Sequence, residues 1–145
     1  MAADNFFPQP FYSPAETGAP VPRVMVAPPR YIQGPGVLAS VGRYLSIINV
    51  KRAAVYASSR GLAEQGPVLT SSLQAAHISS LDCHFSGECS LEAIDEAVQE
   101  FAAEKVDCLI AVGGGKCVDA GKCVAYRLGV PVIVVQTLAS NDAPC

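Results

Sequence analysis

Tryptophan is absent from this 145-residue sequence, histidine occurs twice, and charged residues make up only 16% of it. The formal net charge is −3, so the chain lacks the positive excess with which proteins bind nucleic-acid phosphates. No apolar run is long enough for a signal peptide or a membrane-spanning helix. We therefore expect a soluble, cytoplasmic protein that binds neither nucleic acid nor membrane.

Residue types that usually hold metal ions are also sparse. His77 and His84 belong to no ligand pattern, and we expect ordinary packed or surface side chains there. The six cysteines, at positions 83, 89, 108, 117, 123 and 145, include no pair at the close spacing of zinc motifs. We therefore expect no metal site in this chain, and we expect reduced thiols that act as small hydrophobic side chains at Cys108 and Cys117.

Half of the residues are hydrophobic, which is enough to form the core of one domain. Residues 1–22 contain five prolines and little periodicity, so we expect a disordered, Pro-rich extension there. The remaining residues, 23–145, are expected to form one α/β domain.

Strand-like and helix-like patterns alternate through that domain. A turn is expected at 58–61, Pro67 is expected to open a helix, and Ser90 is expected to cap another. Further helical patterns cover 37–45 and 117–128. We expect strands at 24–27, 31–33, 53–57, 78–85, 106–112 and 130–135.

The last two expected strands are nearly continuous apolar, largely β-branched runs, which fit strands covered on both faces of a parallel sheet. The helix between them has a face of mostly small residues, such as Ala120 and Gly121, which allows close approach to the strands. Alternating strands and helices predict a Rossmann-like, doubly wound α/β fold with a parallel sheet.

Three consecutive glycines follow the apolar run that ends at Val112, and Lys116 comes next. A strand, a glycine turn and a helix start present main-chain N–H groups and the positive helix end to an anion such as phosphate. The pattern is not G-x-G-x-x-G, because Val118 replaces the last glycine, and it is not a P-loop, because Cys117 replaces serine or threonine. A tight turn beside a solvated lysine is the alternative.

Four pieces of the sequence carry a family resemblance in their order and spacing. They are Tyr31 to Gly34, Gly87 to Ser90, Gly113 to Lys116 with Asp119 and Lys122, and Thr137 to Cys145. From about Arg23 to its last residue the chain resembles the N-terminal domain of glycerol dehydrogenases, in the metal-dependent (iron-containing type) alcohol dehydrogenase superfamily. The resemblance implies a dehydroquinate synthase-like N-terminal domain, with the C-terminal helical domain of the family absent. Dehydroquinate synthase and glycerol-1-phosphate dehydrogenase share the glycine turn and remain alternatives.

The resemblance also implies a function and site residues. The expected reaction is oxidation of glycerol or a related diol to the hydroxyketone, with hydride passing to NAD or NADP. Asp142 is expected to accept hydrogen bonds from the substrate hydroxyls, whereas ordinary turn chemistry before Pro144 is the alternative. No catalytic residue is assigned. Cofactor binding is expected at Ser58, Gly114, Gly115, Lys116, Cys117, Val118, Asp119, Thr137, Leu138 and Ser140.

In the family that the chain resembles, one aspartate and two histidines of a second domain hold a catalytic zinc ion, and none of these ligands lies in this chain. We therefore expect the chain alone to be inactive, and the full-length protein to be a homo-oligomer. The alternative is a non-catalytic product that associates with or regulates the full-length enzyme.

One departure from the family pattern concerns the choice of cofactor. NAD-using members usually end the first strand with an aspartate that binds the adenosine ribose, whereas this chain has Ser58, Ser59 and Arg60. Hydroxyls and a cation suit a 2′-phosphate better than a 2′-hydroxyl, which favours NADP. The alternative is that Arg60 simply faces water.

Overall fold

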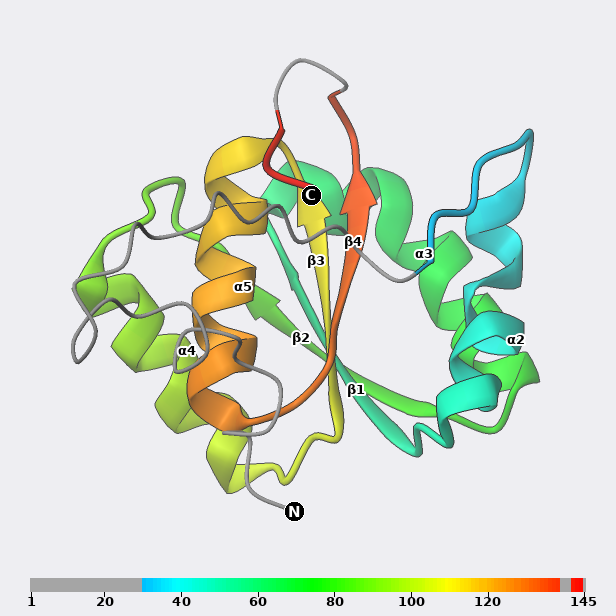
Figure 1. Ribbon diagram of the computed structural model, residues 1–145, viewed down its shortest axis with the longest axis horizontal. Coiled ribbons are helices and arrows are strands. Elements are labelled where there is room, and N and C mark those ends of the chain that lie inside the picture. The colour runs from blue at the N-terminus through cyan, green and yellow to red at the C-terminus, as the bar shows by residue number, and fades with distance from the viewer. Residues whose placement is uncertain (1–29, 139–141, 145) are drawn as a thin grey trace, which may run out of the picture.

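The computed structural model describes residues 30–138 and 142–144. Helices and strands alternate along this part of the chain (Figure 1). In chain order they are η2 (Val37–Ser40), α2 (Val41–Leu45), η3 (Ser46–Ile48), β1 (Arg52–Ala57), α3 (Ser59–Ala75), β2 (Ser79–His84), α4 (Leu91–Ala103), β3 (Cys108–Gly113), α5 (Gly115–Leu128) and β4 (Val132–Gln136).

The four strands form one parallel sheet in the order β2-β1-β3-β4. Ala57 at the end of β1 is level with His84 in β2 and with Val112 in β3. Gly113 of β3 is level with Gln136 of β4. The carboxyl ends of all four strands therefore meet at one edge of the sheet, which is called the carboxyl edge below.

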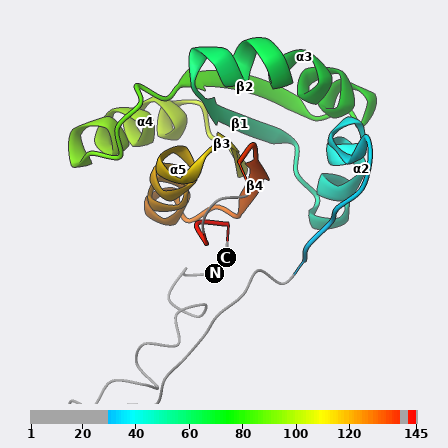
Figure 2. The same cartoon turned by 90° about the horizontal axis from the view of Figure 1, so that it is seen from above.

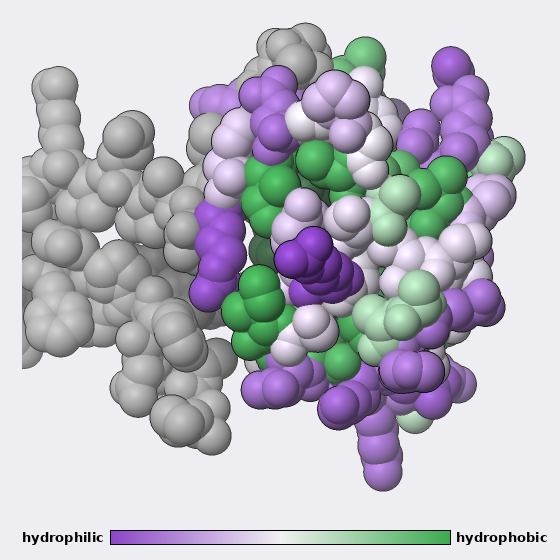
Figure 3. Space-filling model, turned by 90° about the vertical axis from the view of Figure 1, so that its right-hand side faces the viewer, coloured by the Kyte–Doolittle hydropathy of each residue, from purple (hydrophilic) through white to green (hydrophobic). Residues whose placement is uncertain are grey.

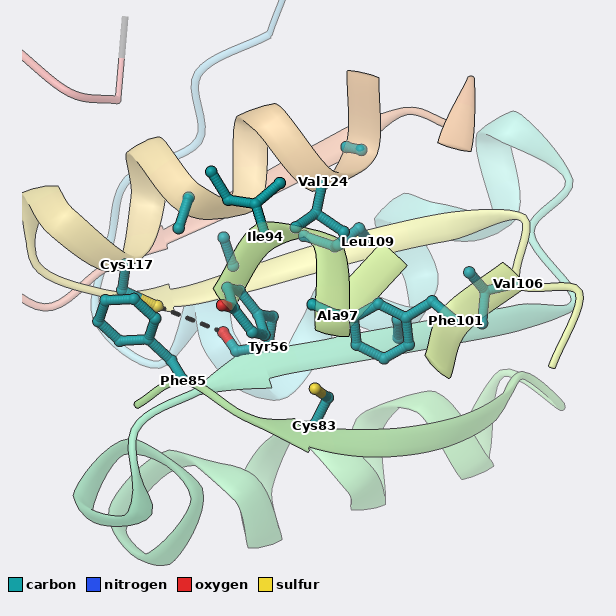
Figure 4. Packing of buried hydrophobic residues seen from close by; sticks show 14 residues of the cluster. Tyr56, Cys83, Phe85, Ile94, Ala97, Phe101, Val106, Leu109, Cys117 and Val124 are labelled. Carbon is teal, nitrogen blue, oxygen red and sulfur yellow. Dashed lines mark hydrogen bonds between the residues drawn. The ribbon is translucent and has the colours of Figure 1, made fainter. Parts of the chain in front are cut away.

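Helices cover both faces of the sheet, with α4 and α5 on one side and α2 and α3 on the other (Figure 2). On the α4 and α5 side, the ring of Tyr56 meets Phe85 and Phe101 edge-on, with centroids 5.5 and 6.3 Å apart (Figure 4). Burial raises the pKa of Tyr56 to about 12. On the other side, Leu69 and Leu73 of α3 pack within a second buried cluster. The predicted doubly wound α/β fold is confirmed.

Serine side chains begin two of the helices. Ser58 accepts a hydrogen bond from the N–H of Gly61 at the start of α3, and Ser90 accepts one from the N–H of Ala93 at the start of α4. Each bond satisfies one N–H group that the helix itself leaves without a partner. The prediction that Ser90 caps a helix is confirmed.

The predictions for the start of α3 were wrong. Residues 58–61 are not a free turn, because α3 begins at Ser59, and Pro67 lies inside the helix rather than at its start. An internal proline costs a helix about 3 kcal/mol or more, through a lost hydrogen bond and a steric clash. Leu69 and Leu73 are fully buried further along the helix, so packing against the sheet outweighs that cost.

Three other predictions need correction. Residues 31–33 form no strand, and their apolar residues Tyr31 and Ile32 are exposed. The pattern over 37–45 is helical but divided between η2 and α2. The last predicted strand, 130–135, is β4, which begins at Val132 and is half-buried, because it lies at one edge of the described sheet. The predictions for residues 1–22 and 24–27 lie outside the described residues.

Helix α5 lies unusually close to β3, and a glycine makes this possible. A Cβ atom at Gly121 would stand 2.6 Å from Cβ of Ala111 and 3.3 Å from Cδ2 of Leu109. Real Cβ atoms do not approach other carbons so closely, so any side chain at Gly121 forces α5 away from β3.

We predict that Gly121→Ala lowers the free energy of unfolding by about 1–3 kcal/mol, because the added methyl group overpacks the interface between α5 and β3. Urea denaturation followed by circular dichroism measures this change. The matched control is Cys123→Ala on the exposed side of α5, where a change within about 0.5 kcal/mol is expected. Equal stability of Gly121→Ala and the parent chain would show that α5 and β3 are not in close contact.

Candidate functional site

The order of the strands creates a crevice at the carboxyl edge. Helix α3 leaves β1 over one face of the sheet, whereas α5 leaves the neighbouring strand β3 over the other face. In open α/β sheets, ligands bind where the direction of winding changes in this way. Ser58 follows β1 and Gly114 follows β3, so the two residues flank this crevice.

The glycine turn, Gly113 to Lys116, forms the centre of the crevice. Gly114 is the N-cap of α5, and no side chain caps the helix there, in contrast to the serine caps of α3 and α4. The first N–H groups of α5 therefore have no partner from a capping side chain and point out of the end of the helix. Such a helix start can bind an anion through its N–H groups and its dipole.

The segment after β4 joins the glycine turn. The N–H of Thr137 donates a hydrogen bond to the carbonyl of Gly113 at 3.0 Å. A Cβ atom at Gly114 would stand 3.4 Å from Cδ1 of Leu138, so the Leu138 side chain borders the turn. Thr137 and Leu138 are both exposed. The structure therefore brings together four predicted site residues, Gly114, Gly115, Thr137 and Leu138, at the carboxyl edge.

Lys116 points its ammonium group at a carboxylate that the sequence analysis did not assign to the site. Its Nζ atom lies 2.7 and 2.9 Å from Oε1 and Oε2 of Glu88, and both side chains are exposed. Glu88 belongs to the loop that joins β2 to α4, so it reaches the glycine turn from a third strand. The sequence did contain a hint of this role, because Glu88 lies in Gly87 to Ser90, one of the four pieces that carry the family resemblance.

Cys117 and Val118 point away from the crevice, into the core. The Sγ atom of Cys117 is hydrogen-bonded to the carbonyl oxygen of Tyr56 at 3.5 Å (Figure 4). It is also hydrogen-bonded to the carbonyl oxygen of Val112 at 3.4 Å. Burial raises the pKa of the Cys117 thiol to about 11. Val118 is fully buried. These two residues can therefore meet a ligand only through their main chain.

The remaining predicted residues occupy different positions. The hydroxyl of Ser58 is engaged as the cap of α3, where it accepts from Gly61 at 3.2 Å. Asp119 is exposed on α5, and Asp142 is exposed in the last described segment. Ser140 lies outside the described residues.

A hydrogen bond joins the start of α3 to the end of β2 beside the crevice. Oγ of Ser59 and Nε2 of His84 are 2.9 Å apart, and both side chains are exposed. The neighbouring Arg60 pairs with Glu64 one turn further along α3, at 2.7 Å. The sequence analysis assigned His84 no role, although it ends a strand at the edge where ligands bind.

Other parts of the described structure carry no comparable arrangement. A hollow between α2 and α3, lined in part by Ser40, Arg43 and Ser72, lies by the last turns of α3 and thus away from the carboxyl edge. Figure 3 shows this side of the molecule, on which apolar and polar residues are intermixed. Within residues 30–138 and 142–144, no cluster of three or more His, Cys, Asp or Glu side chains could hold a metal ion. In the same ranges, no helix combines the length and apolar character needed to cross a bilayer.

The fold and the crevice define a doubly wound α/β domain with a glycine-rich helix start at its switch point. Comparison with known proteins identifies its family. The profile of the family described as "Iron-containing alcohol dehydrogenase" matches residues 28–145, so this chain belongs to that family. The resemblance found in the sequence is confirmed.

Several relatives are glycerol dehydrogenases. The chain is 35% identical over 120 residues to the glycerol dehydrogenase of Thermotoga maritima, covering 83% of this chain and 32% of the relative. It is 34% identical over 125 residues to that of Escherichia coli, covering 85% and 33%. A probable glycerol dehydrogenase from Sinorhizobium meliloti has the same fold, with a TM-score of 0.75 at 30% identity over 86% of this chain and 33% of that one. The chain thus spans about a third of the length of these relatives.

The cysteines provide a prediction about pH. Burial raises the pKa of Cys108 to about 12 and that of Cys117 to about 11, so at pH 8 their reactive thiolate forms are depleted about 100-fold or more relative to an ordinary thiol. We predict that iodoacetamide at pH 8 modifies the exposed Cys123 much faster than either of these buried thiols, as measured by mass spectrometry of peptides.

The control is the same chain unfolded in urea, because all of its thiols should react at similar rates once the fold is lost. Modification of Cys117 as fast as Cys123 in the folded chain would show that the start of α5 is open to solvent.

Proposed function

We propose that this chain binds a nicotinamide dinucleotide with its diphosphate at the glycine turn, as the cofactor-binding part of a dehydrogenase that oxidises glycerol or a related diol to the hydroxyketone. The observation that carries the proposal is the start of α5, which has no side-chain cap and lies at the switch point of the sheet. Relatives named glycerol dehydrogenase support the substrate class.

Each part of the crevice has a role in this binding. The N–H groups of Gly115, Lys116 and Cys117, together with the positive end of α5, would hold the diphosphate. The ammonium of Lys116 would add a charge-assisted contact in place of its exposed bond to Glu88. Gly114 leaves the space beside the turn free of a side chain. When bound, the nicotinamide accepts hydride from the substrate carbon.

The neighbouring strand end would position the rest of the cofactor. Thr137 and Leu138 follow β4, on the side of β3 opposite to β1, so they are suited to the nicotinamide half of the dinucleotide. Ser140 and Asp119 are proposed as further cofactor contacts. Asp142 is exposed, and its carboxylate can accept two hydrogen bonds from a vicinal diol.

We infer that the metal ion is held by a part of the full-length protein outside the third of the relatives' length that this chain matches. The family description names iron, whereas our sequence analysis predicted zinc, and either ion would polarise the substrate oxygen. We propose that the chain binds cofactor but shows no turnover alone, and that its activity requires a metal-bearing domain within a homo-oligomer. A cytoplasmic location is part of this proposal. The alternative is a non-catalytic product that associates with or regulates the full-length enzyme.

Substitution of Gly114 tests the proposal. Gly114 has φ −84° and ψ −175°, which alanine adopts without strain, so Gly114→Ala adds a methyl group beside the turn without a backbone clash, although alanine is a poorer N-cap than glycine. We predict at least about a tenfold loss of affinity for the reduced dinucleotides, measured as the change in their fluorescence on binding, because the methyl group obstructs the approach of the diphosphate.

Gly34→Ala is the matched control, since its Cβ atom would meet Val37 at the same distance, 3.4 Å, in the loop before η2. Binding by this variant should equal that of the parent chain, and thermal unfolding should show that both variants remain folded. Parental affinity in Gly114→Ala would contradict the proposal.

A further inference from the structure

Two exposed cysteines, Cys89 and Cys123, have no role in the proposed dinucleotide site. Cys89 belongs to the loop between β2 and α4, whereas Cys123 lies on α5, and both are free thiols. The other cysteines in the described part of the chain are buried: Cys83, Cys108 and Cys117. Within that part of the chain, Cys89 and Cys123 are therefore the thiols that a soluble oxidant reaches most easily.

Two ion pairs hold the segment that contains Cys89 against α5. Lys116, in the first turn of α5, pairs with Glu88 at 2.7 Å. Arg127, in the last turn of α5, pairs with Asp95 of α4. The two helices also share one buried cluster and lie side by side in Figures 1 and 2. Cys89 directly follows Glu88, so these contacts keep it beside α5.

The helical spacing of α5 turns Cys123 toward the same segment. An α-helix has 3.6 residues per turn, so residues separated by whole turns lie on one side of it. Cys123 lies about two turns beyond Lys116, and Arg127 lies about three turns beyond it. Cys123 therefore shares the side of α5 that carries both ion pairs, and it lies between them.

The electrostatic environment of Cys89 agrees with this placement. The pKa of its thiol is raised, first by partial loss of hydration and then by nearby acidic groups, among which Cys123 has the largest effect. Exposed charges influence one another strongly only within about 10 Å, so the two thiols are close neighbours. A disulfide requires Cα atoms about 4.4–6.8 Å apart. Residues 85–90, which form neither helix nor strand, can adjust to that distance more easily than a helix can.

We propose that Cys89 and Cys123 are a redox modification site, at which hydrogen peroxide converts the two thiols into a reversible disulfide that links the loop before α4 to α5. The inference does not depend on the proposed function, because it concerns only the packing of this loop against α5.

The oxidation consumes one peroxide molecule and releases two molecules of water. One thiolate attacks the O–O bond, takes one oxygen as a sulfenic acid, and the other oxygen leaves as water after protonation. The second thiolate then attacks the sulfenic sulfur, so that an S–S bond forms and hydroxide leaves, to be protonated to water. The two sulfur atoms lose two electrons in total, and a dithiol reductant returns these electrons by thiol–disulfide exchange.

Oxidation of the purified 145-residue chain tests the site. A dilute solution is treated with a small excess of hydrogen peroxide, the remaining thiols are blocked with N-ethylmaleimide, and the chain is digested with trypsin and Glu-C without reductant. Cleavage after Glu88 separates Cys89 from Cys83, so mass spectrometry can assign the linked peptides. The expected result is a cross-link between Cys89 and Cys123 in most of the chain, which dithiothreitol removes.

Thermal unfolding provides a second measurement. A disulfide between these two residues would close a long loop and restrict the unfolded chain, so the oxidised parent is expected to unfold at least about 5 °C above the reduced parent. Cys89→Ser and Cys123→Ser should each abolish both the cross-link and this shift. Cys145→Ser is the matched control and should retain both, because its thiol does not belong to the pair.

Several results would overturn the inference. One is a disulfide that joins Cys89 or Cys123 to Cys145 or to a second chain. Another is oxidation of the two cysteines to sulfenic or sulfinic acids without a disulfide, or no reaction under conditions that oxidise the urea-unfolded chain. A cross-link that lowers the unfolding temperature would also contradict it, because the folded chain would then hold the two thiols apart.

Discussion

The close packing of α5 against β3 is the constraint on which the rest of the structure depends. Gly121 lets the helix approach Ala111, and the buried thiol of Cys117 is hydrogen-bonded to the carbonyl oxygens of Tyr56 and Val112. These contacts hold the first turn of α5 directly after the end of β3. The N–H groups of that turn therefore keep a fixed direction at the carboxyl edge, as an anion site requires.

Every other feature of the crevice is placed relative to that fixed turn. The parallel register brings Ser58, Gly113 and Gln136 to the same edge, and the bond from Thr137 to Gly113 holds the segment after β4 against the turn. Glu88 reaches Lys116 from the loop after β2. The chain belongs to a dehydrogenase family, and the packing explains why we propose a dinucleotide site at this edge.

The sequence predicted those elements whose pattern and packing agree. The buried strands β1 and β3, the capped helix α4 and the small-residue face of α5 all have periodicities that match their burial. Prediction failed where tertiary contacts override local signals, as at Pro67, which stays within α3 because Leu69 and Leu73 are buried. The glycine turn was predictable because a triple glycine after a strand is a local signal, whereas the bonds of His84 to Ser59 and of Glu88 to Lys116 join residues 25 and 28 positions apart.

The central claim is that the diphosphate of a dinucleotide binds to the main chain at the start of α5. Titration of the ¹⁵N-labelled chain with NADPH, followed through amide chemical shifts, tests it most directly. The account predicts that the largest shift changes occur at Gly114, Gly115, Lys116 and Cys117, where the N–H groups meet the phosphates. Unchanged amides at these four residues at saturating NADPH, or the largest changes in the hollow between α2 and α3, would contradict it.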